Sequence, residues 1–158
     1  MPLHAEAERS IDVPAATVYR LIADFKNHHP RFLPPKAVPD FTLEQGGVGA
    51  GTIHRVTIKA AGVSQTYRMR VDEPEPGRVL REAEIDGSTV TTYTVEEEGD
   101  GCRVRLETEW QPAGGLTGVV DRLFGPRVAG RLWSEVLESL DRYAHEHRDA
   151  ATPGTTGG

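Results

Sequence analysis

The sequence predicts an α+β protein in which a curved seven-stranded antiparallel sheet surrounds one long C-terminal helix, with two short helices after the first strand. The order of the amphipathic segments is the first reason. One strand-like segment precedes a short helical segment, six further strand-like segments and a long amphipathic helix. The second reason is that the later strands are joined by connections short enough for hairpins, whereas parallel strands need long crossovers.

The first elements are a strand and a short helix. Residues 3–13 alternate between apolar and polar, which is typical of a half-buried strand, with Arg9 as the one charged residue on the apolar side. Pro14 ends this strand and suits the first turn of a helix. Helical spacing of apolar residues predicts a helix over residues 14–25, and the prolines that follow allow one further helical turn near residues 30–33.

Six segments then alternate with period two, and turn-forming residues separate them. They are residues 38–45, 52–60, 63–72, 78–85, 89–96 and 102–110. In the segment 78–85, the apolar residues predict that the odd-numbered side chains face the interior, and these include Arg81. The glycines of residues 46–51 precede a strand rather than a helix, so they predict a tight turn and not a nucleotide-binding loop.

The C-terminal part is predicted to be a long helix followed by a tail. Apolar residues mostly three or four apart occur between Val119 and Tyr143, and Pro126 predicts a break or kink within this helix. Residues 1–148 are expected to form one domain, since a chain of this length can build one hydrophobic core. The tail of residues 149–158 is expected to be disordered.

Composition and charge exclude several classes of function. The net charge of −6 argues against nucleic acid, because phosphates are bound by basic surfaces. No segment approaches the roughly 18 apolar residues of a membrane span, and the N-terminal segment lacks the apolar core of a signal peptide. Cys102 is the only cysteine, which fits a reducing compartment. We therefore expect a cytoplasmic protein without integral membrane association. The sequence is compatible with a homodimer.

Several segments resemble a known superfamily. The stretch SIDVPAATVYRLIADFKNHHPRFLPP resembles the opening of START-like (SRPBCC, helix-grip) proteins, and the stretches GGVGAGT, VDEPEPGRVL and TVTTYTVEEEGDGCRV are similar to the polyketide cyclase/dehydrase-like branch. The resemblance covers about residues 3–146. It implies a helix-grip (Bet v 1/START-like) fold with a cavity between sheet and helix. Members bind lipids, sterols, plant hormones or polyketides there, and some catalyse cyclisation or dehydration, so fold is implied more firmly than function.

The candidate site residues lie on strand faces that should be concave. His54 shares the parity of Val56 and Ile58, so it should point inward, where a histidine can contact a ligand or act as a general acid or base. A local hydrogen bond near the strand end is the alternative. Large side chains, most of them aromatic with a polar tip, suit a cavity that accepts flat rings, although they also fill cores. These candidates are Tyr67, Met69, Tyr93, Trp110 and Trp133.

Arg81 would be a further ligand contact. A buried arginine needs a carboxylate or an acidic ligand group as its partner, unless a bulge returns it to solvent. His28 and His29 are adjacent and have no further ligands at metal spacing, so we expect an exposed loop pair and no metal site. We also expect no paired carboxylates on the concave face and no hydrolase triad.

The sequence therefore predicts a protein that binds a small hydrophobic ligand, of lipid, aromatic or polyketide type, in a cavity between the sheet and the C-terminal helix. No cofactor is implied. The alternative is a polyketide cyclase, aromatase or dehydratase in the same cavity. Because cyclisation needs mainly positioning of the chain, a shaped pocket with His54 as the candidate acid or base could be enough.

Overall fold

The computed structural model describes residues 2–60, 62–112 and 114–148, with side chains described outside residues 116–124. The tail of residues 149–158, which we expected to be disordered, lies outside the described residues, and the domain boundary at residue 148 stays a prediction. None of the described helices is long and apolar enough to cross a membrane.

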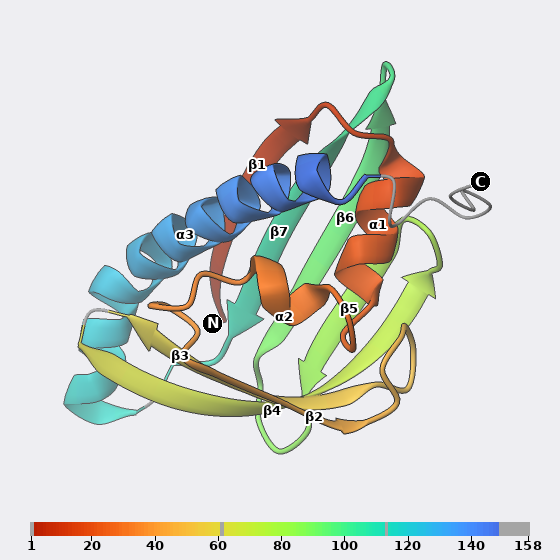
Figure 1. The fold of residues 1–158 in the computed structure, drawn as a ribbon. Coiled ribbons are helices and arrows are strands. Elements are labelled where there is room, and N and C mark those ends of the chain that lie inside the picture. Colours follow the sequence, from red (N-terminus) through yellow and green to blue (C-terminus); the bar gives the residue numbers. More distant parts are fainter. Residues whose placement is uncertain (1, 61, 113, 149–158) are drawn as a thin grey trace.

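A curved seven-stranded antiparallel sheet forms the body of the molecule (Figure 1). Its strands are β1 (Leu3–Ile11), β2 (Asp40–Gln45), β3 (Ile53–Ala60), β4 (Val63–Glu75), β5 (Val79–Glu84), β6 (Val90–Glu98) and β7 (Gly101–Trp110). Their order in the sheet is β1-β7-β6-β5-β4-β3-β2. Consecutive strands from β2 to β7 are neighbours, and β1 pairs with β7 and forms one edge of the sheet. The predicted meander is therefore confirmed.

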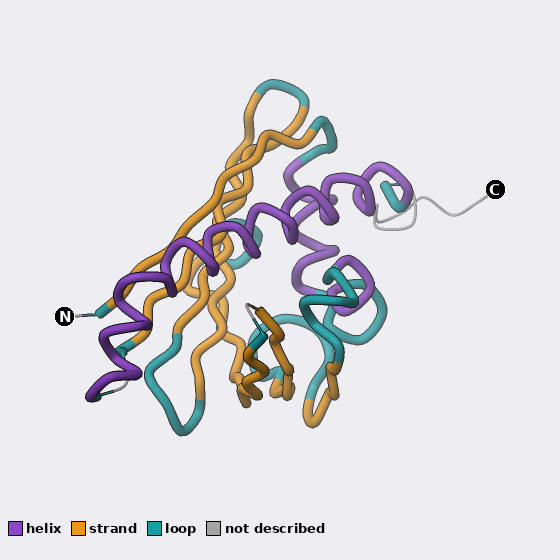
Figure 2. Tube along the Cα trace, turned by 90° about the vertical axis from the view of Figure 1, so that its left-hand side faces the viewer, coloured by secondary structure: helices purple, strands orange, loops and turns teal. Residues whose placement is uncertain are grey.

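Two short helices and one long helix cover the concave side of the sheet (Figures 1 and 2). They are α1 (Ala15–Ala23), α2 (His29–Phe32) and α3 (Gly115–Glu146). Helix α3 continues through Pro126, so a break does not occur there, and a kink at this residue stays a prediction. The loss of one backbone hydrogen bond at a proline does not end this helix. The fold class, a sheet that grips a C-terminal helix, is confirmed.

The hydrophobic core fills one part of the space between sheet and helix. The C-terminal half of α3 contributes Val136, Leu137 and Leu140 to a core shared with α1, β6 and β7, and all three are almost completely buried. Burial of each such side chain stabilises the fold by about 1.5–3 kcal/mol. Cys102 on β7 belongs to this core, and burial raises the pKa of its thiol to about 11.

Strand β1 is tied to α3 by a polar contact at its edge. Arg9, the charged misfit on the apolar side of β1, is exposed and donates from Nε to Oδ2 of Asp141 on α3 at 2.7 Å. Long side chains can cover apolar surface while their charged end stays in water. Arg9 therefore ends outside the core.

The glycine-rich turn of residues 46–51 holds α1 and α2 to the sheet. The carbonyl oxygen of Gly47 accepts the backbone N–H groups of Phe25 and Lys26, and the N–H of Gly49 donates to the carbonyl of Ala23. Gly49 has a φ of +66°, and a Cβ there would overlap the carboxylate of Glu73. The predicted tight turn is confirmed, and it fixes the segment that carries His29.

Candidate functional site

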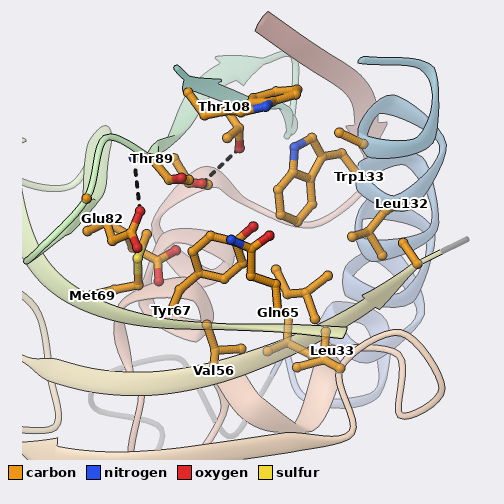
Figure 3. Close-up of a pocket in the computed structure, with 18 of the residues that line it drawn as sticks. Leu33, Val56, Gln65, Tyr67, Met69, Glu82, Thr89, Thr108, Leu132 and Trp133 are labelled. Carbon is orange, nitrogen blue, oxygen red and sulfur yellow. Dashed lines mark hydrogen bonds between the residues drawn. The ribbon is translucent and has the colours of Figure 1, made fainter. Parts of the chain in front are cut away.

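A cavity of about 660 Å³ lies between the sheet and α3. Its walls come from the concave faces of β3 to β7, from the segment after α2 and from the middle of α3, so it occupies the part of the interior that the core leaves open (Figure 3). Most of the lining is apolar. The aliphatic side chains of the wall include Leu33, Val38, Val56, Ile58, Val128 and Leu132.

Six of the seven predicted ligand-binding residues line this cavity. They are His54, Tyr67, Met69, Tyr93, Trp110 and Trp133. Figure 3 shows Tyr67 on β4 and Trp133 on α3 pointing from opposite walls toward the same space. The period-two alternation of the strands and the helical spacing of α3 put these rings on one cavity. Their part in ligand binding stays a prediction.

Arg81 does not line the cavity. It is exposed on the other face of β5, and its Nη2 donates to Oδ2 of Asp72 at 2.7 Å. The predicted parity of β5 was wrong, because this strand turns Leu80 and Glu82 inward. Leu80 lies opposite Tyr93 in the β5–β6 register, and residues directly opposite each other in a sheet share a face.

The same register buries a carboxylate that sequence reasoning missed. Glu82 is only 6% exposed and lies beside His54, which is 2% exposed. The two side chains form a hydrogen bond of 2.5 Å between His54 Nε2 and Glu82 Oε1. Burial alone would raise the pKa of Glu82, but the hydrogen bond and charge of His54 outweigh it and lower this pKa overall. Glu82 is therefore ionised, and His54 donates its Nε2–H to it.

The imidazole of His54 is held in one orientation. It stacks on Phe25 with ring centroids 5.1 Å apart and on Phe41 with centroids 4.8 Å apart. Glu82 occupies Nε2, whereas the buried Nδ1 has no hydrogen-bond partner among the described residues. A histidine whose one ring nitrogen is fixed by a carboxylate presents the other nitrogen in a defined direction. The ring of His54 is therefore fixed by three neighbours, while the described part of the chain leaves its Nδ1 without a partner.

His29 also lines the cavity, and its surroundings differ from those we expected. It is 2% exposed, stacks on Phe25 with ring centroids 4.2 Å apart, and donates from Nδ1 to the carbonyl of Ile22 at 2.6 Å. Burial lowers its pKa to about 4, so the ring is neutral near pH 7. His28 is half-buried and hydrogen-bonds the hydroxyl of Tyr143 at 2.7 Å. The expected exposed histidine pair was therefore wrong.

The remaining polar groups of the wall are mostly satisfied within the protein. The hydroxyls of Thr91 and Thr108 hydrogen-bond each other at 2.8 Å, and Glu84 accepts the backbone N–H of Thr89 at 3.3 Å. The indole Nε1 of Trp133 is the exception, because it is buried and has no hydrogen-bond partner among the described residues. Two buried polar atoms of wall residues, on β3 and on α3, are thus left without a partner from the described part of the chain.

Tyr93 is a phenol of the cavity wall whose pKa is affected by the buried pair. Burial raises its pKa well above the ordinary value, and the negative charge of Glu82 adds to this shift. Its hydroxyl is therefore protonated near pH 7 and can donate a hydrogen bond. The cavity combines apolar walls with a neutral phenol, an indole N–H and a histidine–carboxylate pair.

The comparison with known families agrees with this architecture. Residues 2–145 match the family described as polyketide cyclase / dehydrase and lipid transport. The chain belongs to this family. The match spans every strand and nearly all of α3, so the cavity described above is a feature of the family's domain in this chain.

Proteins similar to this chain include one from a plant and two with solved structures. Pathogenesis-related protein 2 of Petroselinum crispum is 29% identical over 119 residues, which cover 69% of this chain and 75% of the relative. The solution structure of the KanY protein is 27% identical, with a TM-score of 0.80, and the alignment covers 92% of this chain and 99% of KanY. The Zhui aromatase/cyclase from Streptomyces sp. R1128 has a TM-score of 0.74 at 19% identity, covering 93% and 96% of the two chains.

Proposed function

We propose that this protein binds a small, mostly apolar molecule with flat rings in the cavity between the sheet and α3. The observation that carries the proposal is an unfilled cavity of about 660 Å³ with aromatic side chains on opposite walls. This volume lies within the range of roughly 300–1,000 Å³ that is usual for small-molecule pockets. The cytoplasmic location and a homodimer stay predictions.

The composition of the wall supports an organic ligand rather than a permanent filling of water. Buried water is stable where it makes two to four hydrogen bonds to polar groups. Most of the wall here is aliphatic or aromatic, and the threonine hydroxyls at 91 and 108 already bond each other. Flat rings can stack between Tyr67 and Trp133 and bury more apolar surface than water can.

The chain offers a built-in reporter for a binding test. It contains two tryptophans, and both Trp110 and Trp133 line the cavity. We expect naphthalene derivatives to change the intrinsic tryptophan fluorescence in a saturable way, and native mass spectrometry to detect a compound retained from the host. Ala129→Phe, which places a ring in the cavity from α3, should abolish binding, whereas Ser134→Phe at an exposed position of the same helix should not. Absence of binding by the wild-type chain would contradict the proposal.

A second function, catalysis of cyclisation or dehydration, is supported by the His54–Glu82 pair. A buried carboxylate that orients a histidine whose other nitrogen has no partner among the described residues is suited to move a proton to or from a bound substrate. We expect Glu82→Gln to lower turnover of a poly-β-ketone substrate by roughly 10²–10⁴-fold while ligand binding persists. Glu97→Gln, at an exposed position of β6, is the matched control. Unchanged turnover in Glu82→Gln would remove the pair from catalysis.

A further inference from the structure

The cavity wall has an unbalanced set of charged groups. Glu82 and Glu84 both line it from β5, and Glu82 is held ionised by His54. Among the described residues of the wall, none is a lysine or an arginine. An anionic group that entered the cavity would therefore lose its water without a lysine or arginine to replace it, because the imidazole of His54 is already engaged by Glu82.

The two unpartnered atoms, Trp133 Nε1 and His54 Nδ1, differ in the ligand groups with which they can form a hydrogen bond. The indole Nε1–H of Trp133 can only donate, so it calls for an oxygen that accepts. Nδ1 of His54 accepts when the imidazole is neutral and donates when it is protonated. A hydroxyl group satisfies it in both cases, because a hydroxyl both donates and accepts, whereas a carboxylate or an ammonium group satisfies only one case.

We propose that the cavity selects neutral ring compounds that place a hydroxyl group on His54 Nδ1, and that it excludes anionic analogues of the same shape. The inference rests on the proposed function and narrows its ligand class. Glu82 has two effects here. It fixes the imidazole so that Nδ1 meets the ligand, and it neutralises any positive charge on His54, so that carboxylate and sulfonate ligands find no cation. Trp133 adds a second contact from α3, to an oxygen elsewhere on the ligand.

Three naphthalene probes of similar shape separate these effects. At pH 7, 2-naphthol is neutral with a hydroxyl, 2-methylnaphthalene is neutral without a polar group, and 2-naphthoate is an anion. Binding is measured by quenching of the two cavity tryptophans. For the wild-type protein we expect 2-naphthoate to bind roughly tenfold to a hundredfold more weakly than 2-naphthol, because a carboxylate loses its water in a wall that offers no lysine or arginine.

Two variants assign the selectivity to the pair. Glu82→Gln removes the charge without changing the shape, so it should strengthen 2-naphthoate binding about tenfold and leave 2-methylnaphthalene unchanged. The double variant His54→Phe/Glu82→Gln keeps the stacking ring and leaves no buried charge. It should weaken 2-naphthol roughly three- to tenfold, the effect of one hydrogen bond, without weakening 2-methylnaphthalene. Glu97→Gln, an exposed acid outside the cavity, should change none of the three affinities.

The outcomes separate this inference from the function on which it rests. If the wild-type protein binds none of the probes, the proposed function fails. If it binds all three and 2-naphthoate is as tight as 2-naphthol, charge selection is refuted while ligand binding stands, and this comparison needs no variant. Equal loss of 2-naphthol and 2-methylnaphthalene in the double variant would refute the hydroxyl contact. Binding of 2-methylnaphthalene also shows that each variant keeps its cavity.

Discussion

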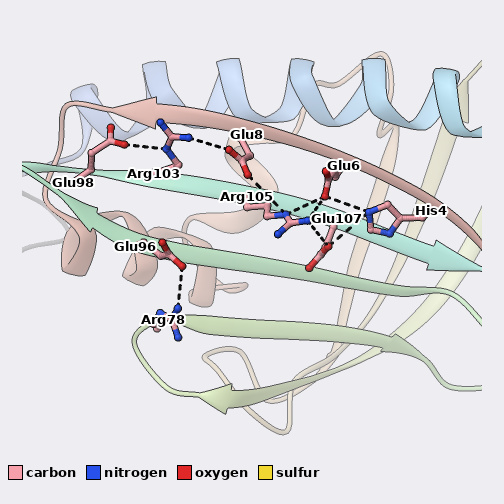
Figure 4. A network of polar contacts seen from close by, with 9 residues as sticks. All are labelled: His4, Glu6, Glu8, Arg78, Glu96, Glu98, Arg103, Arg105 and Glu107. Carbon is pink, nitrogen blue, oxygen red and sulfur yellow. Dashed lines mark hydrogen bonds and ion pairs between the residues drawn. The ribbon is translucent and has the colours of Figure 1, made fainter.

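The two faces of the sheet use the same chemical groups under opposite conditions. On the convex face, arginines and glutamates of β1, β6 and β7, together with Arg78 just before β5, form a series of exposed ion pairs (Figure 4). Arg103 contacts Glu98 at 2.9 Å and Glu8 at 3.1 Å, and Arg105 bonds Glu6. On the concave face, His54 and Glu82 form a pair that is almost completely withdrawn from water. The comparison shows how burial changes the contribution of an ion pair to stability.

Burial decides the consequence of each pair. The hydrogen bond from Arg105 lowers the pKa of Glu6, yet both side chains stay more than two-fifths exposed, so water and salt screen the attraction. Glu82 has no such screening, and the loss of its partner would leave an uncompensated charge in the interior. The convex pairs can therefore be replaced at little cost in stability, whereas replacing one partner of the concave pair is costly.

The largest effect is expected from breaking the buried pair. His54→Ala should lower the free energy of unfolding by about 3–5 kcal/mol, because Glu82 then stays buried without a partner. The measurement is urea unfolding at pH 7. The double variant His54→Ala/Glu82→Gln should be more stable than the single variant, since it removes the unpaired charge. A double variant that is less stable than the single one would show that the unpaired charge of Glu82 is not the cause of the destabilisation.

The next effect comes from a buried histidine that is not paired with an acid. The unfolded chain binds a proton at His29 below about pH 6.5, whereas burial keeps the folded protein from doing so until about pH 4. Stability should therefore fall by about 3 kcal/mol as the pH drops through this range. The lowered pKa of Glu82 acts in the same direction, but only below its ordinary value of 4.5. Unfolding curves at pH 7, 6, 5 and 4 measure the trend.

A pair of histidine variants assigns this pH dependence. His29→Phe removes the titrating group and should flatten the stability curve between pH 6.5 and pH 5, even if the protein is less stable overall. His145→Gln, at an exposed position of α3, should leave the slope as it is. A slope that persists in His29→Phe would show that another group is responsible.

The smallest effect is expected on the convex face. Arg105→Gln should leave the urea midpoint and the affinity of the cavity for neutral ring compounds within experimental error, because the exposed pairs with Glu6 and Glu107 are screened. Unfolding in low and high salt provides the check. A destabilisation as large as that of His54→Ala would contradict the distinction between the two faces.

Much of the fold and most of the cavity wall could be predicted from the sequence, because local periodicity carries them. Alternation along β4 places Tyr67 and Met69 on the inner face, and the spacing of α3 directs Trp133 toward them. These positions depend only on the geometry of a single strand or helix. The cavity residues that could be predicted are apolar or aromatic residues that follow the local pattern of their strand or helix.

The buried charge could not be found in the same way. Glu82 is buried because its partner is His54, 28 residues earlier in the chain, and no local pattern shows that contact. The turn at Asp86-Gly87 did carry a signal, however. A two-residue turn there pairs residue 85 with 88 and thus Leu80 with Tyr93, which sets the inner face of β5. Register was the better guide, because apolar residues on β5 lie on both faces.

His29 shows the second reason for a missed residue. Its neighbours in the sequence are polar residues and prolines that suit an exposed loop. Its burial comes from contacts that only the folded chain provides, namely the ring of Phe25 and the glycine turn that holds this segment to the sheet. Tertiary packing overrides the local character of such a segment.

The lone thiol of Cys102 gives the protein a practical property. It is 1% exposed, and because burial raises its pKa to about 11, little of it is the reactive thiolate at pH 7. Alkylating dyes should therefore react very slowly with Cys102 in the native protein. A cysteine introduced at Val63, which is 64% exposed and lies at the rim of the cavity, would then be the selective attachment point for a fluorophore that reports the arrival of a ligand in real time.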